Sequence, residues 1–184
     1  DLDEIRNQIA SMGSSVEQAL DNSFRALHES DDKLAFKTIL SDLPINRQMR
    51  KIDNLCHAFI AVHLPSAGHL RLISSVIRVN IILERVGDYA VTIAREAVQL
   101  GEAPHDFMSD EMKKICSKSR SILSESISAF NSSNAERAQG TIQMARDLEH
   151  EMDGIYAELL DSTHGDRNTM IYLIIFSQLK RVAD

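Results

Sequence analysis

Apolar residues recur at every third or fourth position along almost the whole chain, which is the spacing of an amphipathic α-helix. At the start, Leu2, Ile5, Ile9 and Met12 follow this spacing, and the pattern continues to Leu27. It predicts an all-α protein with six long helical segments, at about residues 2–28, 31–64, 69–100, 107–131, 135–162 and 167–184.

Polar residues, glycine and proline mark the ends of these segments. Ser30 precedes two aspartates and is expected to cap the second helix. Pro44 is expected to kink or break that helix near Leu43. Gly101 follows the third segment and Pro104 lies just beyond it, as is usual where a helix ends. We expect turns at residues 64–68, 132–134 and 163–166.

The order of long helix, turn, long helix, turn, long helix occurs twice, which indicates an internal duplication. The hexapeptide LERVGD at 83–88 aligns with LKRVAD at 179–184. Short loops between long helices favour antiparallel up-down-up bundles. We therefore predict two tandem three-helix bundles, over residues 1–104 and 105–184. The last helical pattern is still running at Asp184, so we expect the protein to continue beyond it.

Composition narrows the range of functions. Twenty Lys and Arg against 27 Asp and Glu give a net charge of −7, which is unfavourable for a nucleic-acid-binding protein. The longest apolar run, Met170–Phe176, is much shorter than a membrane span, and the polar N-terminus is no signal peptide. Cys56 and Cys116 are too few for a disulfide scaffold, and we expect both to be buried in a protein of a reducing compartment. These features favour a cytoplasmic protein that is at most peripheral to a membrane.

Catalytic motifs do not occur in the sequence: it has no Ser–His–Asp order, glycine-rich phosphate loop or HExxH motif, so we do not expect an enzyme.

The sharpest chemical feature is a set of carboxylates at core-type positions. Leu70, Ile73 and Ile77 share one face of the predicted helix, and Glu84 and Asp88 continue that face. Further acids interrupt the apolar stripes of other helices, namely Asp53, Glu149, Asp153 and Asp184. A buried, unpaired carboxylate costs several kcal/mol, so a cation is its natural partner. Oxygen ligands at this spacing suit Mg, Mn, Fe or Zn. The alternative is that these acids face solvent beside Lys or Arg.

The segment LERVGDYAVTIAREAV at 83–98 resembles the PhoU family of phosphate-transport accessory proteins. The segments INRQMRKID at 45–53 and PSAGHLRLISSVIRV at 65–79 agree with it, and the resemblance covers essentially the whole chain. It implies two similar three-helix bundles whose E/D-x-x-x-D motifs bind iron, zinc or other divalent ions in homologues. It also implies a cytoplasmic homodimer that works beside the ATPase of a phosphate ABC transporter and a phosphate-sensing histidine kinase. Such proteins restrain the phosphate-starvation response when phosphate is plentiful.

The family's metal motifs are only partly present. Glu84 and Asp88 match the motif of the third helix, and Asp53 matches an acid of the second, where Met49 replaces a further acid that is often found. In the second half the matching residues are Glu149, Asp153 and Asp184. Lys180 stands where a glutamate is expected, and its ammonium group can pair with Glu149 or Asp153 in place of a metal. We therefore predict fewer or weaker metals than in a homologue with complete motifs.

Two alternatives remain open at this point. The chain can be a PhoU-type regulatory domain of a membrane protein that resembles a sodium–phosphate cotransporter. It can also be a di-metal carboxylate enzyme of the ferritin-like kind, although the nearest stretch to the Glu-x-x-His pairs of those enzymes, residues 147–150, has the wrong spacing.

Overall fold

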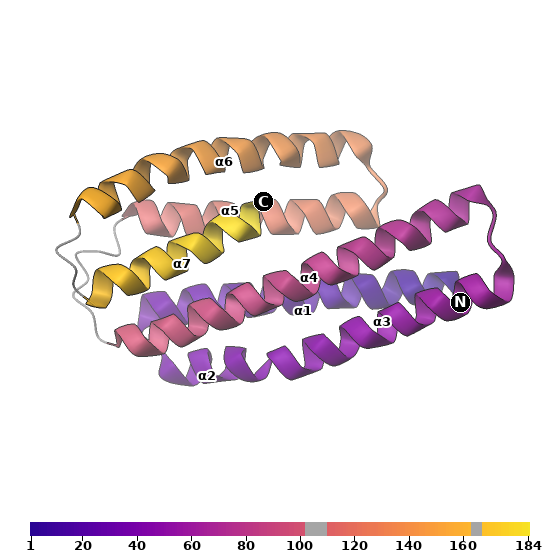
Figure 1. The fold of residues 1–184 in the computed structure, drawn as a ribbon, viewed down its shortest axis with the longest axis horizontal. Coiled ribbons are helices and arrows are strands. Elements are labelled where there is room, and N and C mark those ends of the chain that lie inside the picture. The colour runs from indigo at the N-terminus through magenta and orange to yellow at the C-terminus, as the bar shows by residue number, and fades with distance from the viewer. Residues whose placement is uncertain (102–109, 163–166) are drawn as a thin grey trace.

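Helices account for nearly all of the chain that the structure, a computed structural model, describes, which is residues 1–101, 110–162 and 167–184. These residues form seven helices and no strand (Figure 1). The helices are α1 (Leu2–Glu29), α2 (Asp32–Leu40), α3 (Asp42–His63), α4 (Ala67–Leu100), α5 (Asp110–Asn131), α6 (Ala135–Ser162) and α7 (Arg167–Ala183). The predicted all-α fold class is confirmed.

The first turn differs from the prediction by one residue. Ser30 adopts a left-handed conformation with φ of 51° and ends α1, and its backbone N–H donates to the carbonyl oxygen of Ala26. The cap of α2 is instead Asp31, whose carboxylate accepts a hydrogen bond of 3.0 Å from the N–H of Leu34. Ser30 was expected to be the N-cap and is not, because it is needed to close the preceding helix.

The predicted break near Pro44 is confirmed. The second segment divides at Ser41 into α2 and α3, and Pro44 lies in the first turn of α3. A proline is tolerated there because the first backbone N–H groups of a helix have no partner within it.

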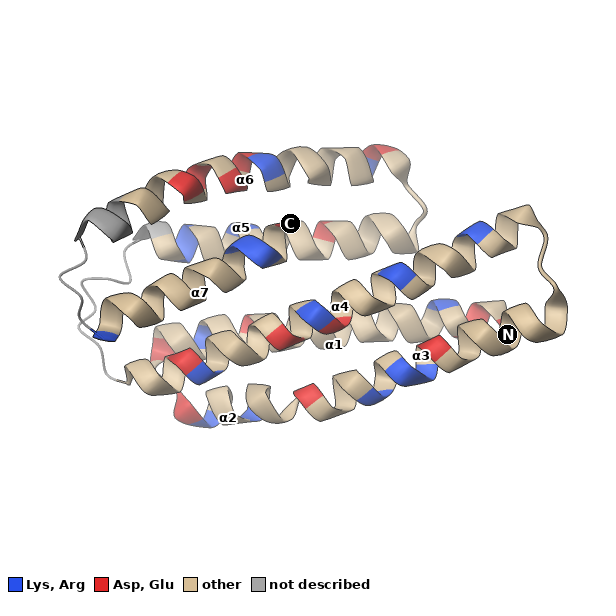
Figure 2. Cartoon of the chain, viewed as in Figure 1, with Lys and Arg blue, Asp and Glu red and all other residues tan. Residues whose placement is uncertain are grey.

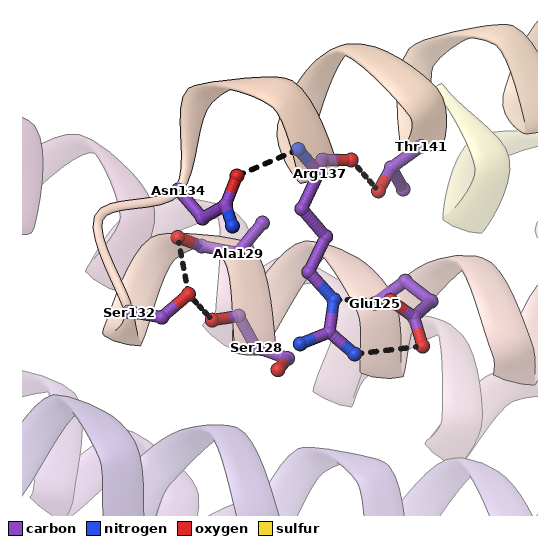
Figure 3. Close-up of polar contacts among 7 residues, drawn as sticks. All are labelled: Glu125, Ser128, Ala129, Ser132, Asn134, Arg137 and Thr141. Atoms are coloured by element: carbon purple, nitrogen blue, oxygen red, sulfur yellow. Dashed lines mark hydrogen bonds and ion pairs between the residues drawn. The ribbon is translucent and has the colours of Figure 1, made fainter.

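The turn between α5 and α6 is held by side chains (Figure 3). Ser133 is left-handed with φ of 52°, and the side chain of Asn134 accepts a hydrogen bond of 2.9 Å from the N–H of Arg137. The guanidinium of Arg137 reaches back to Glu125 on α5, with contacts of 2.6 Å and 3.2 Å to its two carboxylate oxygens. This hydrogen-bonded ion pair lowers the pKa of Glu125. The turn predicted at 132–134 is therefore confirmed.

Two other predicted boundaries fall partly outside the described residues. Gly101 ends α4 with φ of 62°, as expected, whereas Pro104, the predicted start of the fifth segment at residue 107 and the turn at 163–166 are not among the described residues.

The two halves of the chain pack against each other over one core. The long helix α4 lies in the middle of the molecule, with α2 and α3 along one side and α7 along the other (Figure 1). One continuous cluster of buried side chains includes Met12 and Leu20 of α1 together with Phe176 and Leu179 of α7. Helices α1 and α5 approach closely, since a Cβ added at Gly13 would lie 2.9 Å from Ile127 Cγ2.

Cys56 and Cys116 are buried and free, as predicted, and burial raises the pKa of their thiols to about 11 and about 12. No described helix combines the length and apolar character that crossing a membrane requires.

Candidate metal centre

The acids of the third predicted helix lie at the margin of the core rather than inside it. Glu84 is half-buried and Asp88 is exposed on α4. The buried stripe of α4 is instead formed by Ile73, Val76, Asn80, Leu83, Gly87, Ala90, Ala94 and Ala97. Leu70, which we expected in the same stripe as the acids, is 47% exposed. The expected core position of these carboxylates is wrong because α4 contacts several helices, and its apolar face is therefore broad.

A third carboxylate that the sequence analysis missed joins this pair. Asp42, the first residue of α3, lies beside Asp88, close enough for the two carboxyl groups to share a hydrogen bond when one of them is protonated, and it accepts a hydrogen bond of 3.1 Å from the amide of Asn46. Although Asp88 is exposed as a residue, its carboxyl group is partly desolvated by neighbouring side chains, and this raises its pKa to about 6. The charges of Glu84 and Asp42 add to the effect, and that of Arg95 opposes it. Asp42 could have been found from the break before Pro44, because an antiparallel α3 and α4 place the start of α3 beside the second half of α4.

Asp53, by contrast, is not brought to Glu84 and Asp88. The amide of Asn80 donates a hydrogen bond of 2.9 Å to the backbone carbonyl of Met49, and this bond fixes the register of α3 against α4. Met49 and Asn80 therefore lie at the same level along the two antiparallel helices. Asp53 of α3 lies four residues to one side of this level, and Glu84 of α4 lies four residues to the other side. A separation of eight residues corresponds to roughly 12 Å along the helix axes. Asp53 instead lies 3.5 Å from His57.

In the second half, a lysine occupies the centre of the acidic group. Lys180 of α7 lies 2.7 Å from a carboxylate oxygen of Asp153 and 3.7 Å from one of Glu149, both on α6. Its pKa is raised by the hydrogen bond to Asp153 and by the charges of Asp153, Glu149 and Asp184. The pairing predicted for Lys180 is confirmed. All four side chains are at least partly open to solvent.

Comparison with known proteins identifies the family. A family model described as "PhoU domain" matches residues 9–97. A phosphate-specific transport system accessory protein PhoU homolog of Pseudomonas putida is 34% identical over 163 residues, which cover 87% of this chain and 63% of that protein. The crystal structure of PhoU from Pseudomonas aeruginosa superposes with a TM-score of 0.93 at 30% identity, covering 100% of this chain and 90% of that one.

The chain belongs to the PhoU family. The PhoU of Streptococcus pneumoniae, described as a phosphate transport system regulatory protein, has the same fold, with a TM-score of 0.90 at 25% identity. The chain spans less than two thirds of the length of two PhoU homologs from Pseudomonas. It covers 63% of the protein from Pseudomonas putida and 66% of the one from Pseudomonas aeruginosa.

The metal sites that the PhoU family implies fit this chain unequally. In the second half, the ammonium group of Lys180 already contacts Glu149 and Asp153, so the residues do not fit a cation. In the first half, Asp42, Glu84 and Asp88 supply only oxygen donors, the ligands that a divalent cation prefers, and the charge of Arg95 offsets only part of the repulsion at Asp88. Within the three described ranges, however, no group of three or more His, Cys, Asp or Glu side chains is arranged to hold a metal ion. A cation at the first-half acids therefore requires these side chains to move together.

We expect the carboxyl group of Asp88 to make stability depend on pH. Its pKa of about 6 in the folded protein lies above the ordinary value near 3.9, so the folded state binds this proton more tightly than the unfolded state. The stabilisation is fully present below about pH 4 and is lost as the pH rises through about 6. With a chelator present, the free energy of unfolding should fall from pH 4 to 7 more steeply in the native protein than in Asp88→Asn. A carboxyl resonance of Asp88 that titrates near pH 4 would contradict this prediction.

Proposed function

We propose that this PhoU-family chain is an accessory protein of a phosphate-specific transport system that holds the phosphate-starvation response off when phosphate is plentiful. The observation that carries the proposal is the similarity to Pseudomonas aeruginosa PhoU along the whole chain. The names of relatives from Pseudomonas putida and Serratia marcescens, both phosphate-specific transport system accessory proteins, support it.

In this proposal the chain is a cytoplasmic, non-enzymatic adaptor that acts as a homodimer. Its partners are the ATPase of the phosphate ABC transporter and a phosphate-sensing histidine kinase. An adaptor of this kind transmits phosphate status by binding one state of a partner more tightly than the other, because only differential affinity shifts an equilibrium between states.

A genetic experiment tests the proposed function. A host that lacks its own PhoU and carries a phosphate-starvation reporter should express the reporter in phosphate-rich medium, and this chain should silence it. The matched control is Phe176→Ala, a destabilised core variant of the same chain. A reporter that stays on while the folded chain accumulates would contradict the proposal. Co-purification with the transporter ATPase or the kinase then separates the two partners.

We further propose that Asp42, Glu84 and Asp88 bind a divalent cation with low affinity. Support comes from the proximity of Glu84 and Asp42 to Asp88 and from the repulsion among the three acids, which Arg95 offsets only in part and which a cation would relieve. The affinity is low because binding must first draw the side chains together. The second-half acids do not take part, since the ammonium group of Lys180 already pairs with Glu149 and Asp153.

Calorimetric titration with Mn²⁺ or Zn²⁺ at fixed ionic strength tests the cation site. We expect saturable binding that Glu84→Ala plus Asp88→Ala abolishes. Asp53→Ala should leave binding unchanged, because Asp53 lies roughly 12 Å from Glu84 along the helices. Binding that survives the double substitution, or that depends on Asp53, would show that the cation is held elsewhere.

A further inference from the structure

Helices α2 and α3 follow each other almost in line along one outer edge of the molecule (Figure 1). Their charge is opposite to that of the protein as a whole. Helices α2 and α3 together contain five Lys and Arg and three Asp, a net charge of +2, whereas the entire chain has a net charge of −7. The five cations, Lys33, Lys37, Arg47, Arg50 and Lys51, are all exposed, and we call this surface the basic edge (Figure 2).

The cations of the basic edge are not held in ion pairs, although Asp32 lies exposed beside Lys33 at the start of α2. None of the five takes part in an ion pair with any described residue. The two acids of α3, Asp42 and Asp53, are half-buried and contact Asp88 and His57 instead. On α3 the outward positions follow the helical spacing from residue 43 through 47, 50 and 54, and no carboxylate lies among them. The basic edge therefore carries free positive charge.

Large apolar side chains lie among these cations. Phe36, Leu40 and Leu43 are 54%, 75% and 55% exposed, and their spacing of four and three residues places them in succession across the junction of α2 and α3. Exposed apolar side chains flanked by Lys and Arg are typical of helices that lie on a membrane surface, with the apolar groups at the boundary between headgroups and acyl chains.

A lipid surface suits this edge better than a protein surface does. A stable protein–protein interface buries about 800 Å² on each partner and needs close shape complementarity. Three apolar side chains on an outer edge provide much less apolar area than that. An anionic bilayer requires no complementary shape, and each nearby Lys or Arg adds to the attraction.

We propose that the basic edge docks on an anionic phospholipid surface. Phe36, Leu40 and Leu43 enter the boundary between headgroups and acyl chains, and the five cations contact headgroup phosphates. This goes beyond the proposed adaptor function, because it holds the chain at the membrane without any transporter subunit.

Vesicle sedimentation tests the lipid proposal without any partner protein, so its outcome is independent of the proposed function. The native chain should sediment with phosphatidylcholine vesicles that contain phosphatidylglycerol, remain in solution with phosphatidylcholine alone, and dissociate as salt is added. Lys37→Gln plus Arg47→Gln plus Arg50→Gln should weaken binding on the order of 100-fold, at about fivefold for each cation. Leu40→Ser plus Leu43→Ser should weaken it about tenfold or more with all charges retained.

The matched control removes the same charge from a different helix. Arg71, Arg78 and Arg85 are exposed on α4, and replacing all three with glutamine should leave vesicle binding close to native. Equal losses in the α4 control and the basic-edge variant would show that binding follows net charge, and the proposal would be wrong. It would also be wrong if native protein ignored anionic vesicles but bound polyglutamate through the same cations, since the occupant would then be an acidic protein. Circular dichroism of each variant establishes that it is folded.

Discussion

Phe176→Ala is expected to lower the free energy of unfolding by about 3–5 kcal/mol, the usual cost of truncating a buried phenylalanine. Phe176 is 2% exposed and is among the largest fully buried side chains. It lies on α7 at a point where helices of both halves meet, and its ring centroid is 6.4 Å from that of Tyr156 on α6. For a chain of this size the corresponding fall in melting temperature is roughly 10 °C.

The same variant tests whether the two halves unfold together. Because one core cluster runs from α1 to α7, we expect the whole chain to unfold in a single transition at a lower temperature. Phe36→Ala is the matched control, since Phe36 is 54% exposed and its truncation should change the free energy of unfolding by about 0.5 kcal/mol or less. Two separate transitions, with only one shifted by Phe176→Ala, would mean that the repeats are independent domains. Differential scanning calorimetry distinguishes these outcomes.

Much of this fold could be predicted from local sequence signals. Apolar spacing locates the helical segments, and their boundaries fall at or near a glycine, a proline or a capping side chain, as just before Pro44 and at Gly101 and Asn134. The error at Ser30 shows the limit of such signals. Serine is a good N-cap, but here the backbone of Ser30 is left-handed and closes α1, so Asp31 caps α2.

The positions of the acids could be predicted less well, because burial depends on which neighbours a helix contacts. Glu84 and Asp88 continue an apolar face by spacing alone, yet α4 packs so that the buried stripe runs through Asn80 and Leu83 beside them. Asp42 was missed because its proximity to Asp88 depends on where α3 begins before Pro44 and on the antiparallel packing of α3 and α4, which apolar spacing alone does not show. The contacts of Lys180 were anticipated because an oppositely charged residue among acids needs no exact register to find a partner.

Lys180→Glu is expected to create a divalent-cation site where the native protein has none. In the native chain the ammonium group of Lys180 contacts Asp153 and Glu149, and Asp184 follows four residues later, just after the end of α7. The substitution would leave four carboxylates on facing turns of α6 and α7, with no cation among them. Oxygen ligands in this number suit Mg²⁺, Mn²⁺ or Zn²⁺. We expect the affinity for Mn²⁺ to rise by about 100-fold or more over that of the native second half, as measured by calorimetry.

The comparison that isolates the cause is Lys180→Ala, which removes the positive charge without adding a ligand. If Lys180 only blocks the site, both substitutions should bind metal; if the fourth carboxylate is needed, only Lys180→Glu should. Both measurements are made with Glu84→Ala plus Asp88→Ala present, so that the first-half acids do not contribute. Without metal, the repulsion among four carboxylates should make Lys180→Glu less stable at neutral pH than at acid pH, and Mn²⁺ should restore its melting temperature. A variant that gains neither metal affinity nor this pH dependence would show that α6 and α7 hold their acids too far apart for one ion, whatever residue stands at position 180.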